Sequence, residues 1–139
     1  MATANKYEVF SEDLAEKVHD LNADTLRVML SNTTPNLATH ALRSQFTELS
    51  TSNGYTSAGI DTQNATSRSG GVTSVTGVDA VWTATVGGFG PFRYVGLFND
   101  TPTSPLDPLI LNWDYGSSIT LADGETFTVD FGTSLFTIT

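Results

Sequence analysis

Apolar and polar side chains alternate with a period of two near the C-terminus, and this pattern limits the fold more than any other feature. Phe127, Val129 and Phe131 alternate with threonines and an aspartate. A period of two is what a strand with one buried face requires. Asp123-Gly124 supplies a tight turn before this strand, and residues 109–121 read as a strand, a turn and a second strand.

Similar runs occur upstream and are separated by turn signals such as Asn53-Gly54. About seven to nine short strands at this density of turns predict a mainly β fold, an antiparallel β-sandwich or jelly roll. Residues 92–98 are apolar on both faces apart from Arg93, which indicates a central strand. In residues 25–31 we expect Leu26, Val28 and Leu30 to face inward. The other expected strands are residues 46–49, 60–67 (an exposed edge), 72–75, 78–86 and 135–139, with a break at 87–91.

One helix is predicted, in residues 10–22. Phe10, Leu14, Val18 and Leu21 fall on one face at helical spacing, and Ser11 is a suitable N-cap. Such a short helix needs packing against other structure to persist. We therefore divide the chain into an N-terminal segment, residues 1–23, and a β-sandwich domain, residues 24–139. The segment either closes the end of its own sandwich or docks as an arm on a neighbour, and the sequence favours neither.

The composition excludes several classes of partner. The chain has 15 acidic and 6 scattered basic residues, a net charge of -9, so we expect no nucleic-acid partner. No run approaches the roughly 18 apolar residues of a membrane span, and the N-terminus lacks the apolar stretch of a secretory signal. We therefore expect no membrane partner and synthesis in a cytoplasm. The 0 Cys leave the redox compartment open.

No catalytic motif is found in the sequence. A nucleophilic site needs a base, and only His19 and His40 titrate near neutral pH; His19 falls on the polar side of the predicted helix and His40 in a loop. Asp114 lies between Trp113 and Tyr115, as an acid in a sugar site would, but in a strand it takes the opposite face. The interpretation favoured for all three is structural, so the chain is predicted not to be an enzyme.

Metal and phosphate sites are predicted to be absent as well. Residues 87–90 are rich in glycine, but no Lys-Ser or Lys-Thr follows and Pro91 stops a helix. Several turn residues are of types that bind Ca²⁺, yet Asn and Asp are also the usual turn residues and no repeat unites them. We therefore expect no cofactor. The turn residues in question are Asn99, Asp100, Asp107 and Asp123.

Five fragments together resemble small virion structural proteins of tailed bacteriophages and prophages. They span most of the chain from Asp24 onward. The fragments are DTLRVMLSNTTP (24–35), NGYT (53–56), GPFRY (90–94), FNDT (98–101) and WDYGSSITLADGETFTVDF (113–131).

The resemblance implies a non-enzymatic particle component, most similar to a capsid decoration, or cement, protein. Such a protein is a small β-sandwich bound to the outer capsid surface, commonly as a homotrimer, where it bridges neighbouring subunits of the major capsid protein. Many weak contacts summed over a lattice then give avidity. The residues expected to contact the partner are Phe10, Leu14, Arg43, Tyr55 and Phe89.

Two alternatives remain open. A tail or fibre-attachment component would have the same composition but fewer copies. A glycan-binding jelly roll on the virion surface would stack sugars on Trp82, Trp113 or Tyr115, which requires at least one of these to be exposed.

Overall fold

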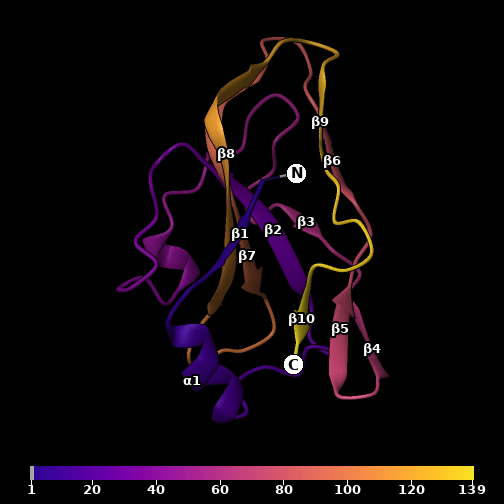
Figure 1. Ribbon diagram of the computed structural model, residues 1–139. Coiled ribbons are helices and arrows are strands. Elements are labelled where there is room, and N and C mark those ends of the chain that lie inside the picture. Colours follow the sequence, from indigo (N-terminus) through magenta and orange to yellow (C-terminus); the bar gives the residue numbers. More distant parts are fainter. Residues whose placement is uncertain (1) are drawn as a thin grey trace.

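The computed structural model describes residues 2–139, which form two packed β-layers with one α-helix beside them (Figure 1). Strands make up 46% and helices 7%, so the predicted mainly β, antiparallel sandwich is confirmed, whereas jelly-roll connectivity stays a prediction. The elements are β1 (Ala4–Lys6), α1 (Val9–Ala15), β2 (Leu26–Ser31), the 3-10 helix η1 (Arg43–Gln45), β3 (Ile60–Asp61), β4 (Ala65–Ser69), β5 (Val72–Thr76), β6 (Ala80–Thr83), β7 (Phe89–Asn99), β8 (Leu109–Leu121), β9 (Thr126–Val129) and β10 (Phe136–Ile138).

The first layer is a five-stranded sheet in the order β1-β8-β7-β2-β3, and every neighbouring pair is antiparallel. β7 lies at the centre, as its two apolar faces predict. The break expected at residues 87–91 is only partial, because β7 begins at Phe89 and its pairing with β8 shifts register between Phe89 and Phe92. β7 and β8 are the longest strands; β1 pairs with β8, β2 pairs with β7, and β3 is added at the far edge of β2.

The second layer is one long, irregular ribbon with β4 added to it. β5 pairs with β4 and β10, and β6 pairs with β9. β6 follows β5 in the chain, and β10 follows β9. Between the two pairings the ribbon is held by the amide of Leu135, which donates to the Val75 carbonyl at 2.7 Å, and by the amide of Phe131, which donates to Asp79 Oδ1 at 2.9 Å.

The main core fills the space between the layers. Aromatic rings dominate it: the Phe92 and Phe127 rings meet edge to face with centroids 4.8 Å apart, and the Trp82 ring stacks near Tyr55 at 6.2 Å. Offset and edge-to-face pairs of this kind add to the burial of apolar area. Val129 and Phe131 are buried, as the alternating pattern predicts.

A second, smaller core lies on the outer face of the five-stranded sheet, under the long connection 32–59. The expectation for β2 was incomplete: Leu26, Val28 and Leu30 are buried, but so are Met29 and Ser31, because this connection covers the other face. A Cβ on Gly96 would lie 2.9 Å from the Phe46 ring, so glycine lets that ring lie across β7. The residues of this core are Tyr7, Met29, Phe46, Tyr94, Phe98 and Leu109.

The Asn53-Gly54 turn forms as predicted and ties the connection 32–59 to the second layer. The Ser52 and Tyr55 amides each donate to the other's carbonyl, and Gly54 has φ +105°. A Cβ on Gly54 would lie 2.2 Å from the Thr83 carbonyl oxygen. The Thr85 amide donates to the Asn53 carbonyl at 2.8 Å, so the turn packs directly against the end of β6.

The predicted helix is shorter than expected and starts earlier. It begins at Val9, so Ser11 lies inside it rather than capping it, and it ends at Ala15. Lys17 takes φ +66°, its amide donates to the Leu14 carbonyl, and the Val18 amide donates to the Asp13 carbonyl. This is the Schellman arrangement that terminates helices.

Two predicted strand features were also wrong in detail. Residues 109–121 form a single strand with no turn inside it, because Gly116 is accommodated within β8 at φ +84°. Residues 46–49 make one isolated bridge, Ser31 with Glu48, in place of a strand. The edge strand expected at 60–67 is divided into β3 in one layer and β4 in the other.

The N-terminal segment packs on its own sandwich. β1 pairs with β8 over Ala4–Lys6, and the Tyr7 amide donates to the Ile110 carbonyl at 3.0 Å. Tyr7 is fully buried in the second core. The sequence left open whether this segment packs on its own sandwich or docks on a neighbour. In this structure it packs on its own sandwich, along β8.

Candidate interaction surface

Two loops meet over the second core and form a surface that we call the loop face. Its residues are Leu42, Arg43, Ser44, Phe46, Glu48, Leu106 and Asp107, around a depression of about 370 Å³. The loops are bonded to each other through the backbone. The Arg43 amide donates to the Asp107 carbonyl and the Leu109 amide to the Ala41 carbonyl, both at 2.9 Å.

Arg43 lies at the centre of this face, where the sequence placed a partner contact. Its Nη2 donates to Glu48 Oε2 at 2.8 Å, its Nη1 lies 3.7 Å from Asp107 Oδ2, and its guanidinium lies over the Phe98 ring at 5.1 Å. Burial alone would lower the pKa of Arg43, but hydrogen bonding and charge from Glu48, with Asp107, raise it overall. The guanidinium therefore stays charged and fixed in place.

Glu48 holds the connection 32–59 in place beneath the loop face. Its side chain accepts hydrogen bonds from Arg43, from the Tyr55 hydroxyl at 2.8 Å, from the Ala58 amide at 2.6 Å and from the Ser57 hydroxyl at 3.3 Å. The Tyr55 oxygen accepts in turn from the Leu30 amide at 3.0 Å. Burial is the main cause that raises the pKa of Tyr55 above its usual value, so the phenol remains a donor.

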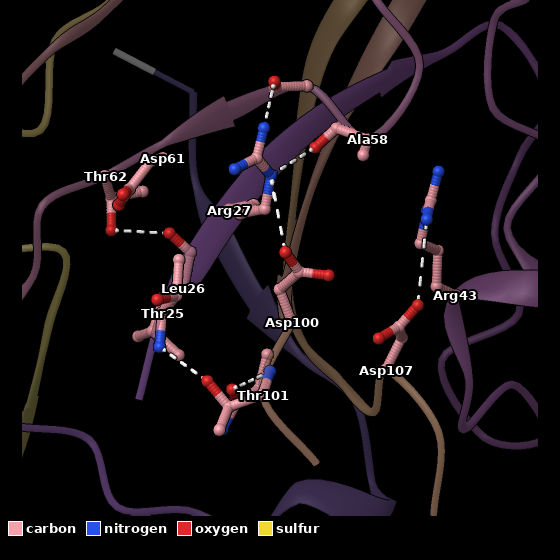
Figure 2. Close-up of polar contacts among 12 residues, drawn as sticks. Thr25, Leu26, Arg27, Arg43, Ala58, Asp61, Thr62, Asp100, Thr101 and Asp107 are labelled. Atoms are coloured by element: carbon pink, nitrogen blue, oxygen red, sulfur yellow. Dashed lines mark hydrogen bonds and ion pairs between the residues drawn. The ribbon is translucent and has the colours of Figure 1, made fainter. Parts of the chain in front are cut away.

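A second arginine fixes the neighbouring edge of this surface (Figure 2). Arg27 Nε donates to the Ala58 carbonyl at 3.0 Å, and Arg27 Nη2 donates to the Gly59 carbonyl at 2.8 Å. Asp100 Oδ2 lies 3.9 Å from Arg27 Nε. The Thr25 amide donates to Thr101 Oγ1 at 2.9 Å.

Desolvation and the charge of Asp100 raise the pKa of Asp107, and the positive charge of Arg43 partly offsets this rise.

One large apolar side chain projects from these ordered loops. Leu106 is 58% exposed, next to Asp107 and beside the depression that Arg43 lines. Leu106 borders a depression whose polar groups are held in place, and an apolar centre within a polar rim is the usual anatomy of a protein contact. The loop face is therefore the candidate interaction surface.

The other predicted contact residues do not reach it. Tyr55 is 1% exposed, Phe89 4% and Phe10 4%, all within the main core. Leu14 is partly buried against that core. The sequence predicts Tyr55 and Phe89 to be surface groups because they lie in or beside loops, but the sandwich buries both. Of the five residues, only Arg43 lies on the loop face.

His19 is buried, contrary to its predicted place on the polar side of a helix. The chain turns inward after Lys17, and Asn99 Nδ2 lies 3.0 Å from His19 Nδ1 and 2.7 Å from Asp24 Oδ2. Burial lowers the pKa of His19 to about 4. His40 lies elsewhere, accepting from the Asn36 amide at 3.2 Å. Sequence reasoning missed this cluster because its members are joined only by the fold.

The aromatic residues considered for sugar stacking differ in exposure. Trp82 and Trp113 are buried at 3% and 2%. Tyr115 is half-buried and meets the Phe127 ring edge to face at 5.2 Å. On the opposite face of β8, Asp114 takes two hydrogen bonds from Arg93, at 2.7 and 3.0 Å, which hold the pKa of Asp114 below its usual value.

Two further findings concern residues 2–139 alone. Within that range no cluster of three or more His, Asp or Glu side chains is arranged to hold a metal ion. None of the helices described there is long and apolar enough to cross a membrane.

Comparison of the chain with protein-family models, with curated proteins and with solved structures finds no match.

Proposed function

We propose that this chain is a non-enzymatic virion structural protein of a tailed bacteriophage, a decoration protein that binds the outer surface of the capsid. In this role it bridges neighbouring subunits of the major capsid protein, acts as a homotrimer and remains on the virion surface. The resemblance in fragments such as 24–35 and 113–131 supports the proposal.

The observation that carries the proposal is the loop face. Its loops have little freedom to lose on binding, because Arg43, Glu48 and Asp107 already hold them in one arrangement. Preorganised loops reduce the entropy cost of association. Leu106 then supplies apolar area that only a partner would cover.

On a capsid lattice, many copies of such a small contact together suffice for attachment. Each loop face offers a modest apolar anchor within a polar rim, which is adequate for a weak single contact. A trimer that engages several capsid subunits at once multiplies the effective concentration of each further contact. The acidic surface, with a net charge of -9, also keeps the chain from binding packaged nucleic acid.

Binding to capsids tests this proposal directly. Purified chain is mixed with capsids of the same phage that lack it, both before and after expansion, and the bound fraction is measured by co-sedimentation. Leu106→Asp should weaken binding by about tenfold or more, since it places a charge in the anchor. Val81→Asp is the matched control, because Val81 is 50% exposed but lies on β6 in the other layer.

If neither capsid form binds the unmodified chain, the proposal is wrong. Equal binding by the two variants would leave the capsid role standing and remove the loop face from it. Thermal unfolding of both variants, compared with the parent chain, shows that each is folded.

A further inference from the structure

The two layers are joined along one side of the sandwich and not along the other. On the joined side, the Val78 amide donates to the Thr62 carbonyl at 2.7 Å and the Thr85 amide to the Asn53 carbonyl at 2.8 Å. On the opposite side, β1 is the last strand of its sheet and β10 the last strand of its own (Figure 1). Within residues 2–139, no backbone hydrogen bond links these two edge strands.

A groove of about 430 Å³ lies between β1 and β10, and we call it the seam groove. Leu14 of α1 and Leu111 of β8 form part of its lining, with Phe136 and Ile138 from β10. Leu14, Phe136 and Ile138 are only partly buried against the main core. An apolar occupant would complete their burial, which is favourable in proportion to the area covered.

Both walls of the groove are strand edges. An edge strand presents unpaired backbone N–H and C=O groups, and an extended peptide can satisfy them by adding one more strand. The side chains of Phe136 and Ile138 share one face of β10, and Ala4 and Lys6 share one face of β1. The groove thus offers the two features that strand addition uses, backbone partners and spaced apolar contacts.

The charge of the groove restricts its occupant. Lys6 is the charged residue in its lining, in a chain with 15 acidic residues. Lys6 Nζ donates to the neutral Ser11 hydroxyl, and among the described residues it takes part in no salt bridge. A carboxylate on the occupant would supply the missing opposite charge.

A lysine on an edge strand also discourages two copies from pairing edge to edge. A second copy of this chain is therefore the less suitable occupant, and a segment of a different protein is favoured.

We infer that the seam groove binds an extended segment of a partner protein, which adds as a strand along the free edge of β10. The segment has apolar side chains at alternate positions and a carboxylate that reaches Lys6. This inference does not depend on the capsid role, because it follows from the two strand edges, the apolar lining and the charge of Lys6.

The test uses short synthetic peptides and the full, isotopically labelled chain. The probes are capped peptides of alternating valine and threonine in which one aspartate is placed at successive positions. NMR titration should give saturable shifts at Phe136, Thr137 and Ile138, with slower amide exchange there. The same peptide N-methylated at its central residues should bind about tenfold more weakly or worse, because it loses backbone donors.

Two variants sharpen the result. Ala4→Asp should weaken peptide binding about tenfold, because it adds a negative charge to the groove that receives the peptide carboxylate, whereas Ala65→Asp, at an exposed edge position on β4, should not. Lys6→Glu should reverse the preference from an aspartate peptide to the matched lysine peptide.

Three outcomes of the peptide experiments would overturn the inference. They are no saturable shift at millimolar peptide, shifts centred on another strand such as β4, and equal affinity for the N-methylated probe. Concentration-dependent self-association that Ala4→Asp abolishes would identify a second copy as the occupant and would also contradict the inference. Capsid binding by the loop face would be unaffected in each case.

Discussion

At the scale of single residues, the polar groups that sequence reasoning weighs for chemistry are used to hold loops. Glu48 accepts hydrogen bonds from four residues beneath the loop face, and the Asn99 amide contacts both His19 and Asp24. A buried polar group is stabilising only while its partners are present. These positions should therefore be sensitive to substitutions that barely change side-chain volume.

Glu48→Gln should lower the free energy of unfolding by about 2 kcal/mol, because Arg43 loses the nearer of its two carboxylate partners and several donors lose a charged acceptor. Urea denaturation measures the change. Glu16→Gln is the matched control: Glu16 is exposed on the surface and should give a change within about 0.5 kcal/mol. Equal effects of the two substitutions would show that Glu48 does not organise the loop.

His19 should make stability depend on pH. Burial lowers its pKa to about 4 in the folded chain, while the unfolded value is about 6.5. The unfolded chain therefore binds the extra proton first as pH falls from 7 to 4. Stability is fully present above pH 6.5, and about 3 kcal/mol is lost by pH 4.

Urea denaturation between pH 7 and pH 4 checks this sign and size. His19→Gln should remove that part of the pH dependence, because no proton is then taken up at this position on unfolding. His40→Gln should keep it. A pH profile unchanged by His19→Gln would contradict the buried, neutral state of His19.

At the scale of elements, strands were predicted well and their ends poorly. The two-residue period identified β2, β6 and β9, because alternation is a local property of each strand. The centre of β7 was identified by its two apolar faces. The end of α1 was missed, since Lys17, a residue without glycine's freedom, takes the left-handed conformation there. The second core was missed because a loop, rather than a strand, covers it.

The same limit applies to the candidate surface. Arg43 was selected from the sequence, but Leu106 was not, because its exposure depends on how two distant loops pack. The available signal was weak: Leu106 lies between Pro105 and Pro108, which constrain the loop backbone but do not fix where its side chain points.

Gly54→Ala should lower the free energy of unfolding far more than the same substitution at an ordinary turn glycine. Its φ of +105° disfavours a side chain, and the added Cβ would lie 2.2 Å from the Thr83 carbonyl oxygen. We expect a loss of at least about 2 kcal/mol, against about 1 kcal/mol for Gly124→Ala. Gly124 has φ +82°, but the Cβ would meet no other atom of residues 2–139 within 4 Å.

Thermal and urea unfolding of the two glycine variants give the comparison. Because both positions have positive φ, their difference isolates the steric contact that docks the turn against β6. Equal losses would mean that this contact is not needed to join the two layers on that side.

At the scale of the whole molecule, the sandwich has two surfaces with different properties. The loop face is preorganised and carries one exposed apolar side chain, Leu106. The seam groove is apolar, lies between two strand edges and carries Lys6. A domain that holds one partner at each surface can bridge neighbouring subunits, which is the mechanical role of a decoration protein.

The central claim is best tested by the copy number of this chain in purified virions. Quantitative mass spectrometry, with the major capsid protein as internal standard, measures it. The capsid role predicts copies on the order of hundreds, since decoration relies on many repeated contacts. Complete absence from the particle, or the small copy number of a tail or fibre component, would contradict it.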